Sequence, residues 1–242
     1  MNKILYIAGY GRSGSTYLDR KLTIDTESVG VGELSYLSKE FLDEKYCCSC
    51  GEVYSKCRLW SIPNIDHEKL SIISNEYESP FSIFKKLRKE YSTPTSTIMD
   101  TAFSFYNAKV LIDSSKSCRD NALRPIRLKQ LGYNVNVIHL KRPLRSVLKS
   151  VQKGTNKKLA GQAEEKSFRV FRAIFSWIYS NIIAHSFRYV RGIEYIYVDQ
   201  EELLLNPDSV VRKISTKFEL ERRKSNLVCQ HVVAGNRSKY EG

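Results

Sequence analysis

Short apolar runs alternate along this chain with longer segments of mixed hydrophobic and polar residues. The runs are rich in Val, Ile and Tyr and stop at turn residues, which is typical of short buried strands. Four such strands are predicted: Lys3–Ala8, Val110–Ile112, Val135–Leu140 and Ile193–Val198. The segments between and after them predict helices: Ser15–Leu22, Arg119–Leu131, Leu144–Gln152, Phe168–Phe187 and Pro207–Phe218. Strands separated by helices indicate an α/β protein of three layers, with a central parallel sheet flanked by helices.

The helix predicted over residues 168–187 has the clearest periodicity. Large apolar side chains recur every three or four residues, at Phe171, Ile174, Phe175, Ile178 and Ile182. Because this is the spacing of an amphipathic helix, we expect the stripe to belong to the hydrophobic core.

Residues 34–108 are less regular. They contain a cysteine cluster and then KKLRKEYSTPTST, a basic stretch rich in Ser, Thr and Pro. We expect an insertion on the α/β core, serving as a lid or as an acceptor-binding segment. A single domain over residues 1–242 accounts for the length of the chain.

The chain carries 39 Lys and Arg against 26 Asp and Glu, a formal net charge of +13. Such an excess predicts an anionic partner: nucleic acid, an anionic membrane or saccharide, or a phosphorylated small molecule. The cations are spread over the chain without a recognised nucleic-acid motif, so we expect no specific nucleic-acid partner. No apolar stretch has the length of a signal peptide's core or of a transmembrane segment, which favours a cytoplasmic protein.

A glycine-rich loop follows the first predicted strand and precedes a predicted helix. It reads GYGRSGST from Gly9 to Thr16, and this order typically forms an anion site from free backbone N–H groups and the positive end of the helix. Its glycines also match the G-x-G-x-x-G pattern of dinucleotide-binding proteins, with Glu33 near the position of the acid that binds the ribose. The alternative function is therefore an NAD(P)-dependent oxidoreductase. A nucleotide triphosphatase is disfavoured, because its loop needs Lys where this chain has Ser15.

A third interpretation uses the cation and the hydroxyls of the loop as well. The segment Arg12-Ser13-Gly14-Ser15-Thr16 resembles the 5′-phosphosulfate-binding loop of sulfotransferases that use 3′-phosphoadenosine 5′-phosphosulfate (PAPS). Arg142 follows a predicted strand and Ser150 lies eight residues later, which resembles the 3′-phosphate element of that family. A planar guanidinium and a hydroxyl two helical turns apart can close on one phosphate. The segment from His231 to Lys239 is similar to one found in bacterial and tyrosylprotein-type members.

The resemblance implies the P-loop nucleotide-hydrolase-like fold of sulfotransferases, with PAPS as sulfate donor and 3′-phosphoadenosine 5′-phosphate (PAP) as product. No metal is required by analogy with the family. The sulfuryl group would pass in line to a hydroxyl or amine of a saccharide, a lipid or a small natural product. The nucleotide-binding residues that it implies are Arg12, Ser13, Gly14, Ser15, Thr16, Arg142, Ser150, Tyr197, Gly235, Asn236, Arg237 and Lys239.

The same resemblance implies three catalytic residues. Arg12 would stabilise the leaving phosphate, and Lys116, just after the second predicted strand, would face the sulfonate. Glu33 matches the Gly-Glu of tyrosylprotein-type members and would take the acceptor's proton. Asp113 is the alternative base.

Four of the six cysteines, Cys47, Cys48, Cys50 and Cys57, lie within eleven residues, so they form a local cluster. Cys-x-Cys with a third thiol can bind zinc, but two clean C-x₂-C pairs are lacking. A similar stretch occurs in some bacterial sulfotransferase-like proteins and implies a structural cluster, with a local disulfide as one option. We therefore assign none of the cysteines as a metal ligand.

Overall fold

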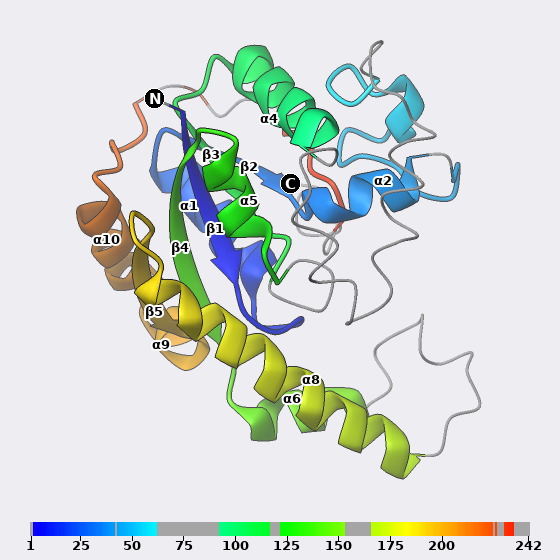
Figure 1. Cartoon of the computed structure of the whole chain (residues 1–242), viewed down its shortest axis with the longest axis vertical. Helices are drawn as coiled ribbons and strands as arrows, with labels where there is room; N and C mark the ends of the chain where they lie inside the picture. The colour runs from blue at the N-terminus through cyan, green and yellow to red at the C-terminus, as the bar shows by residue number, and fades with distance from the viewer. Residues whose placement is uncertain are drawn as a thin grey trace.

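The computed structural model describes residues 2–41, 43–61, 92–116, 122–152, 166–224, 226 and 230–234. Within these residues the chain forms a five-stranded sheet in the order β2-β3-β1-β4-β5 (Figure 1). The strands are β1 (Lys3–Ala8), β2 (Ser28–Gly32), β3 (Val110–Asp113), β4 (Asn134–Lys141) and β5 (Glu194–Asp199). Each neighbouring pair runs parallel, so the predicted α/β class with a central parallel sheet is confirmed.

β1 lies in the middle of the sheet and shows why the protein has three layers. Successive side chains of a strand point to opposite faces, so Ile4, Tyr6 and Ala8 belong to one core and Leu5 and Ile7 to the other. All five are buried. The sheet is therefore covered on both faces, as parallel sheets are.

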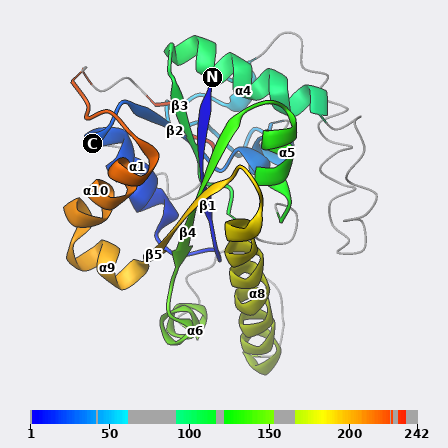
Figure 2. The same ribbon diagram turned by 60° about the vertical axis from the view of Figure 1, so that its left-hand side comes forward.

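Helices supply the two covering layers (Figure 2). The first core is closed by α4 (Ser92–Tyr106), α5 (Arg124–Gln130), α8 (Lys166–Ser186) and much of the segment 34–60. The second is closed by α1 (Ser15–Asp25), α9 (Gln200–Leu205) and α10 (Pro207–Phe218). The short α2 (Leu37–Glu40) comes soon after β2, and α6 (Leu144–Gln152) follows β4 and packs against α8. None of the described helices is both long enough and apolar enough to cross a membrane.

β2 and α4 lie where no strand or helix was predicted, as do the short helices α2 and α9. β2 was not predicted because its sequence, SVGVG, has few large apolar residues; Gly30 is needed there because a Cβ would overlap the carboxyl group of Asp19 in α1. α4 occupies part of the region expected to be irregular, and its Met99, Ala102 and Phe103 are buried. The expectation of an irregular segment is therefore wrong for residues 92–106. Residues 62–91 lie outside the described residues.

α8 packs against the protein through a different face from the predicted one. Its buried positions are small or polar: Ala173, Ser180, Asn181 and Ala184. Most of the apolar residues expected in the core are instead exposed: Phe171 (67%), Phe175 (66%), Ile178 (43%) and Ile182 (62%). The prediction that this stripe belongs to the core is wrong, because periodicity identifies an apolar face but not what covers it.

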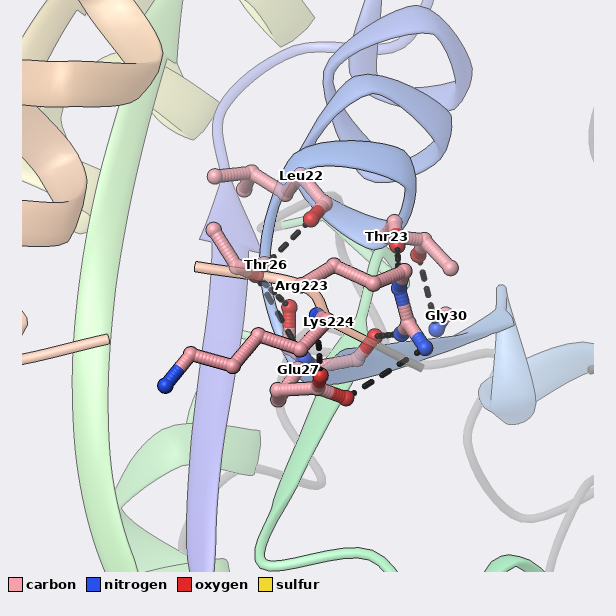
Figure 3. Close-up of polar contacts among 8 residues, drawn as sticks. Leu22, Thr23, Thr26, Glu27, Gly30, Arg223 and Lys224 are labelled. Carbon is pink, nitrogen blue, oxygen red and sulfur yellow. Dashed lines mark hydrogen bonds and ion pairs between the residues drawn. The ribbon is translucent and has the colours of Figure 1, made fainter. Parts of the chain in front are cut away.

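The chain after α10 is tied back to α1 and β2 (Figure 3). The Arg223 guanidinium donates to the carbonyl oxygens of Thr23 (2.7 Å) and Ser28 (2.8 Å), and lies 3.5 Å from a carboxylate oxygen of Glu27. The backbone N–H of Lys224 donates to the other Glu27 oxygen at 2.6 Å. These contacts hold the start of the C-terminal segment beside β2.

Candidate functional site

The glycine loop joins β1 to α1 at the carboxyl end of the sheet. Its backbone includes three residues of positive φ: Gly9 (130°), Arg12 (65°) and Gly14 (90°). Glycine is required at the first of these, because a Cβ there would overlap the backbone carbonyl of Leu140 in β4. Gly14 precedes α1 and has no side chain to cap it, so the free N–H groups of the first helical turn remain for a ligand. The loop therefore has the features of an anion-binding site.

The fold brings Arg142 to this loop. Its Nη1 donates to the carbonyl oxygen of Arg12 at 2.7 Å, although the two residues are 130 positions apart. The Nε of Arg142 is buried and has no hydrogen-bond partner, and no described carboxylate forms an ion pair with this guanidinium. Burial first, and then the charge of Arg12, lower the pKa of Arg142. Two predicted phosphate-binding cations are thus close enough to repel each other.

Ser150 lies on α6, eight residues after Arg142, and the helix has the predicted bounds. The Ser150 side chain is half-buried. No described hydrogen bond links it to Arg142, so the geometry leaves the 3′-phosphate role of Ser150 a prediction.

A second charged group occupies the ends of β2 and β3. Glu33 directly follows β2, Lys116 comes shortly after β3, and Lys116 Nζ lies 2.5 Å from Glu33 Oε1. Only 10% of the Glu33 side chain and 13% of the Lys116 side chain are exposed. Lys116 has a φ of 67°, and its carbonyl oxygen accepts a hydrogen bond from the Tyr6 hydroxyl. Such a backbone costs about 1–3 kcal/mol, and residues of this kind concentrate at functional sites.

Asp113, the alternative base, is already paired. Its Oδ2 lies 2.7 Å from Arg124 Nε. Its Oδ1 accepts hydrogen bonds from the backbone N–H of Ser115, at 3.0 Å, and from the Ser115 hydroxyl. The carboxylate is fully buried, so these partners satisfy it inside the protein. This arrangement favours Glu33 over Asp113 as the group that can face a substrate.

Sequence reasoning missed Asp19. It lies on the buried side of α1 and is fully buried. Burial raises the pKa of Asp19 to about 8, although the Ser114 side chain and the backbone of Gly32 favour the charged form. It is therefore protonated at neutral pH. Its signal in the sequence is an acid next to Leu18 on the face of the helix that the apolar pattern assigns to the core.

Tyr197 lines a cavity of about 510 Å³ between α8 and the strands β4 and β5. Its walls include Trp177, Tyr189 and His139. Trp177 Nε1 donates to the carbonyl oxygen of Arg142 at 2.8 Å, so the cavity borders the loop site. His139 is buried and hydrogen-bonded to Asn181 (2.9 Å), and burial lowers its pKa. The cavity is a half-open hollow with aromatic walls.

The C-terminal segment reaches the same edge of the sheet. Val233 forms a parallel bridge with Gly32, and its carbonyl accepts the backbone N–H of Glu33 at 2.8 Å. The predicted 3′-phosphate residues that follow lie outside the described residues: Gly235, Asn236, Arg237 and Lys239. Ala234, the last described residue before them, directly follows Val233, which contacts Gly32 and Glu33.

The clustered cysteines Cys47, Cys48, Cys50 and Cys57 are free thiols. The local disulfide considered from the sequence is therefore not formed in this structure. A hydrogen bond from the Cys48 thiol, and then backbone N–H groups, lower the pKa of Cys57. The same contact with Cys57, and then burial, raise the pKa of Cys48.

Comparison with known proteins identifies the fold. No protein-family model and no curated protein sequence matches the chain. Among solved structures, it resembles a sulfotransferase domain from the curacin biosynthetic pathway, with a TM-score of 0.57 and 20% identity over 98% of this chain and 80% of that one. This chain has a sulfotransferase fold. It also resembles the sulfotransferase domain of the Synechococcus PCC 7002 olefin synthase (TM-score 0.55, 19% identity, 100% of this chain, 80% of that chain). The sulfotransferase STF9 from Mycobacterium avium matches with a TM-score of 0.50 and 12% identity, over 90% of this chain and 64% of that one.

The charged groups of this sulfotransferase fold have distinct chemical capacities. The loop and Arg142 form a cationic, donor-rich surface that can hold phosphate or sulfate oxygens. The Glu33–Lys116 pair offers a carboxylate that can take a proton, held by a cation that can stabilise negative charge nearby. Among the described residues, the sheet places both on its carboxyl edge, where open α/β sheets bind ligands.

Proposed function

We propose that this protein is a sulfotransferase that moves the sulfuryl group of PAPS to a hydroxyl or amine of an acceptor and leaves PAP. The observation that carries this proposal is the approach of Arg142 to the loop residue Arg12. A buried guanidinium N–H without a partner, beside a second cation, is expensive unless an anion completes the site. A nucleotide with a 5′-phosphosulfate and a 3′-phosphate would supply that charge.

The residues present fit this donor. Arg12, the backbone N–H groups of Ser13–Thr16 and the hydroxyls of Ser15 and Thr16 would bind the 5′-phosphosulfate, while the Ser13 hydroxyl donates to the Tyr10 carbonyl at 2.8 Å. Arg142 and Ser150, with the predicted residues of the C-terminal segment, would bind the 3′-phosphate. The aromatic cavity that Tyr197 lines borders Arg142 and would take the flat adenine ring by stacking.

Glu33 is the proposed base. Lys116 Nζ lies 2.5 Å from Glu33 Oε1 and so orients the carboxylate that would accept the acceptor's proton. PAPS, when bound, supplies the sulfuryl group and a phosphate leaving group. Arg12 and Lys116 would then stabilise the negative charge that develops on the oxygens around sulfur and phosphate. The acceptor proton ends on Glu33.

The oxidoreductase alternative is not favoured. In the dinucleotide-binding fold, the strand that carries the ribose-binding acid lies beside β1. Glu33 instead follows β2, and β3 separates β2 from β1 in the sheet.

The test compares Glu33→Gln with the parent protein. PAP and NADPH affinities are measured by titration calorimetry, and transfer from labelled PAPS to a panel of saccharide, lipid and small-molecule acceptors is scored by mass spectrometry. We expect PAP binding in both proteins, and a loss of transfer of about 10²- to 10⁴-fold in the variant, because general base catalysis contributes about that much. Unchanged transfer would assign the base elsewhere, and tight NADPH binding without PAP binding would overturn the function itself.

A further inference from the structure

Four side chains that the proposed reaction does not use converge at one point beside β2. The Sγ atoms of Cys48, Cys50 and Cys57 and the Nδ1 atom of His231 all lie within 4.8 Å of one another. Cys57 Sγ is 3.1 Å and Cys48 Sγ 3.7 Å from His231 Nδ1, and the sulfurs of Cys50 and Cys57 are 3.8 Å apart. Cys48, Cys57 and His231 are buried, and Cys50 is half-buried.

These spacings are close to the edges of a zinc tetrahedron. Bonds of about 2.3 Å to sulfur and about 2.0 Å to nitrogen place two sulfurs about 3.8 Å apart, and sulfur and nitrogen about 3.5 Å apart. We propose that Cys48, Cys50, Cys57 and His231 bind one zinc ion in a structural Cys₃His site. The donor set favours zinc, because three thiolates and one imidazole in a tetrahedron suit this ion.

The backbone of the cysteine loop prepares this geometry. Cys48 N–H donates to the Glu52 carbonyl at 2.8 Å, and Gly51 N–H returns to the Cys48 carbonyl at 3.0 Å, which makes a tight turn around Cys50. Gly51 has a φ of 92°, a conformation that favours glycine. Such outer backbone contacts orient thiolate ligands.

The fourth ligand is held just as firmly from outside the loop. The backbone N–H of His231 donates to the Tyr106 hydroxyl at 2.7 Å, and its carbonyl accepts Trp60 Nε1 at 3.0 Å. Its ring meets the ring of Phe105 edge-on, with centroids 5.3 Å apart. Because α4, the cysteine loop and the C-terminal segment all fix this residue, little reorganisation would accompany metal binding.

The ion would join two distant parts of the chain. The cysteine loop spans residues 47–60, and the segment 230–234 carries His231 on one side and, through Val233, pairs with Gly32 next to Glu33. Four protein ligands leave no open position, so the role is structural. On binding, the three thiols release their protons to solvent, the neutral imidazole keeps one, and no electron is transferred. The proposed zinc site does not depend on the proposed sulfuryl transfer.

The experiment measures metal in the full chain, purified in a phosphine reductant without chelator. We expect about one zinc per chain when the metal content is measured by inductively coupled plasma mass spectrometry. We also expect that cobalt(II) added to metal-depleted protein gives the visible bands and the thiolate charge-transfer absorption of a tetrahedral thiolate complex. Cys57→Ser and His231→Ala should lose most of the metal. The matched control is Cys47→Ser, which removes a neighbouring thiol that is not among the four proposed ligands and should keep the full amount of metal.

A second measurement covers the case in which Cys57→Ser does not fold. A strong chelator is added to the unaltered protein, and the rate of thiol modification is followed; we expect three thiols to become reactive and the melting temperature to fall by several degrees. Absence of both zinc and cobalt binding overturns the proposal. So does a mass two units below that of the reduced chain, which marks a disulfide, or an equal loss of metal in Cys47→Ser.

Discussion

The two halves of the sheet's carboxyl edge carry opposite arrangements of charge. At the ends of β2 and β3, two cations each meet a buried carboxylate, Lys116 with Glu33 at 2.5 Å and Arg124 with Asp113 at 2.7 Å. At the ends of β1 and β4, Arg142 instead meets the carbonyl of another arginine, Arg12, and has a buried N–H without a partner.

In the β2–β3 half each of the two cations has a carboxylate partner within the protein. In the β1–β4 half no described carboxylate pairs with Arg142, so a ligand can supply the negative charge. A buried ion pair tolerates desolvation only while both partners are present. A cation whose pKa is lowered by burial and by a neighbouring cation, as that of Arg142 is, gains from an anion that arrives from outside. We therefore propose anion binding for the β1–β4 half and proton transfer for the β2–β3 half. Four substitutions test this division.

The largest effect is expected for Arg124→Ala in the ligand-free protein. The substitution leaves Asp113 buried without its cation, which should lower the free energy of unfolding by about 3–5 kcal/mol. Arg142→Ala is the matched control, and it should cost little stability because it removes a cation that another cation repels. Denaturant unfolding of both variants measures this. Equal losses would mean that the two halves do not differ in the way we propose.

Arg142→Ala should have its effect on nucleotide binding. A charge-assisted hydrogen bond contributes about 1.5–3 kcal/mol, so the affinity for PAP should fall about 10- to 100-fold. Calorimetric titration checks this, with Arg145→Ala as control, because Arg145 is an exposed arginine on the neighbouring helix α6. A loss of similar size in both variants would point to diffuse electrostatics instead of a built site.

Asp19→Asn tests whether the β2–β3 half keeps Asp19 protonated beside the carboxylates of Asp113 and Glu33. The parent carboxyl has a folded pKa of about 8 against an ordinary value of 3.8, so between these values the folded state binds a proton that unfolding releases. Its contribution to stability should therefore fall as pH rises, by about 2 kcal/mol from pH 6 to pH 8. The unfolding free energy of Asp19→Asn, measured against the parent protein at each pH, should lack that decline. An equal decline of the unfolding free energy in both proteins would show that Asp19 is already ionised in the folded state over this pH range.

The smallest effect is expected for Ser150→Ala. One hydroxyl hydrogen bond to the 3′-phosphate is worth about 0.5–1.5 kcal/mol, so the PAP affinity should fall about 2- to 10-fold. Adenosine 5′-phosphate, which lacks the 3′-phosphate, serves as the control ligand in the same titration. Its affinity should not change, and an equal loss for both ligands would exclude Ser150 from the 3′-phosphate site.

The sequence predicted those elements whose signals are local. β1, α6 and α10 have the predicted bounds, since a buried apolar run, a proline at a helix start and an amphipathic repeat all act over a few residues. β2 was missed because it contains glycines where other segments come close, Gly32 beside Val233 of the C-terminal segment and Gly30 beside Asp19 of α1. The exposed stripe of α8 was misjudged because burial of an apolar face depends on whether another element covers it. Both errors concern contacts between segments far apart in the chain.

The sequence by itself determined the main elements and motifs of this protein: a parallel α/β arrangement, a glycine loop with a cation, and a strand followed by Arg142. Only the tertiary structure decided which parts meet. Glu33 and Lys116 are 83 residues apart, and Cys57 and His231 are 174 apart, yet each pair is in contact. The physical reason is that sheet order and helix packing set these pairings through burial of apolar surface over the whole domain, and no local pattern records the result.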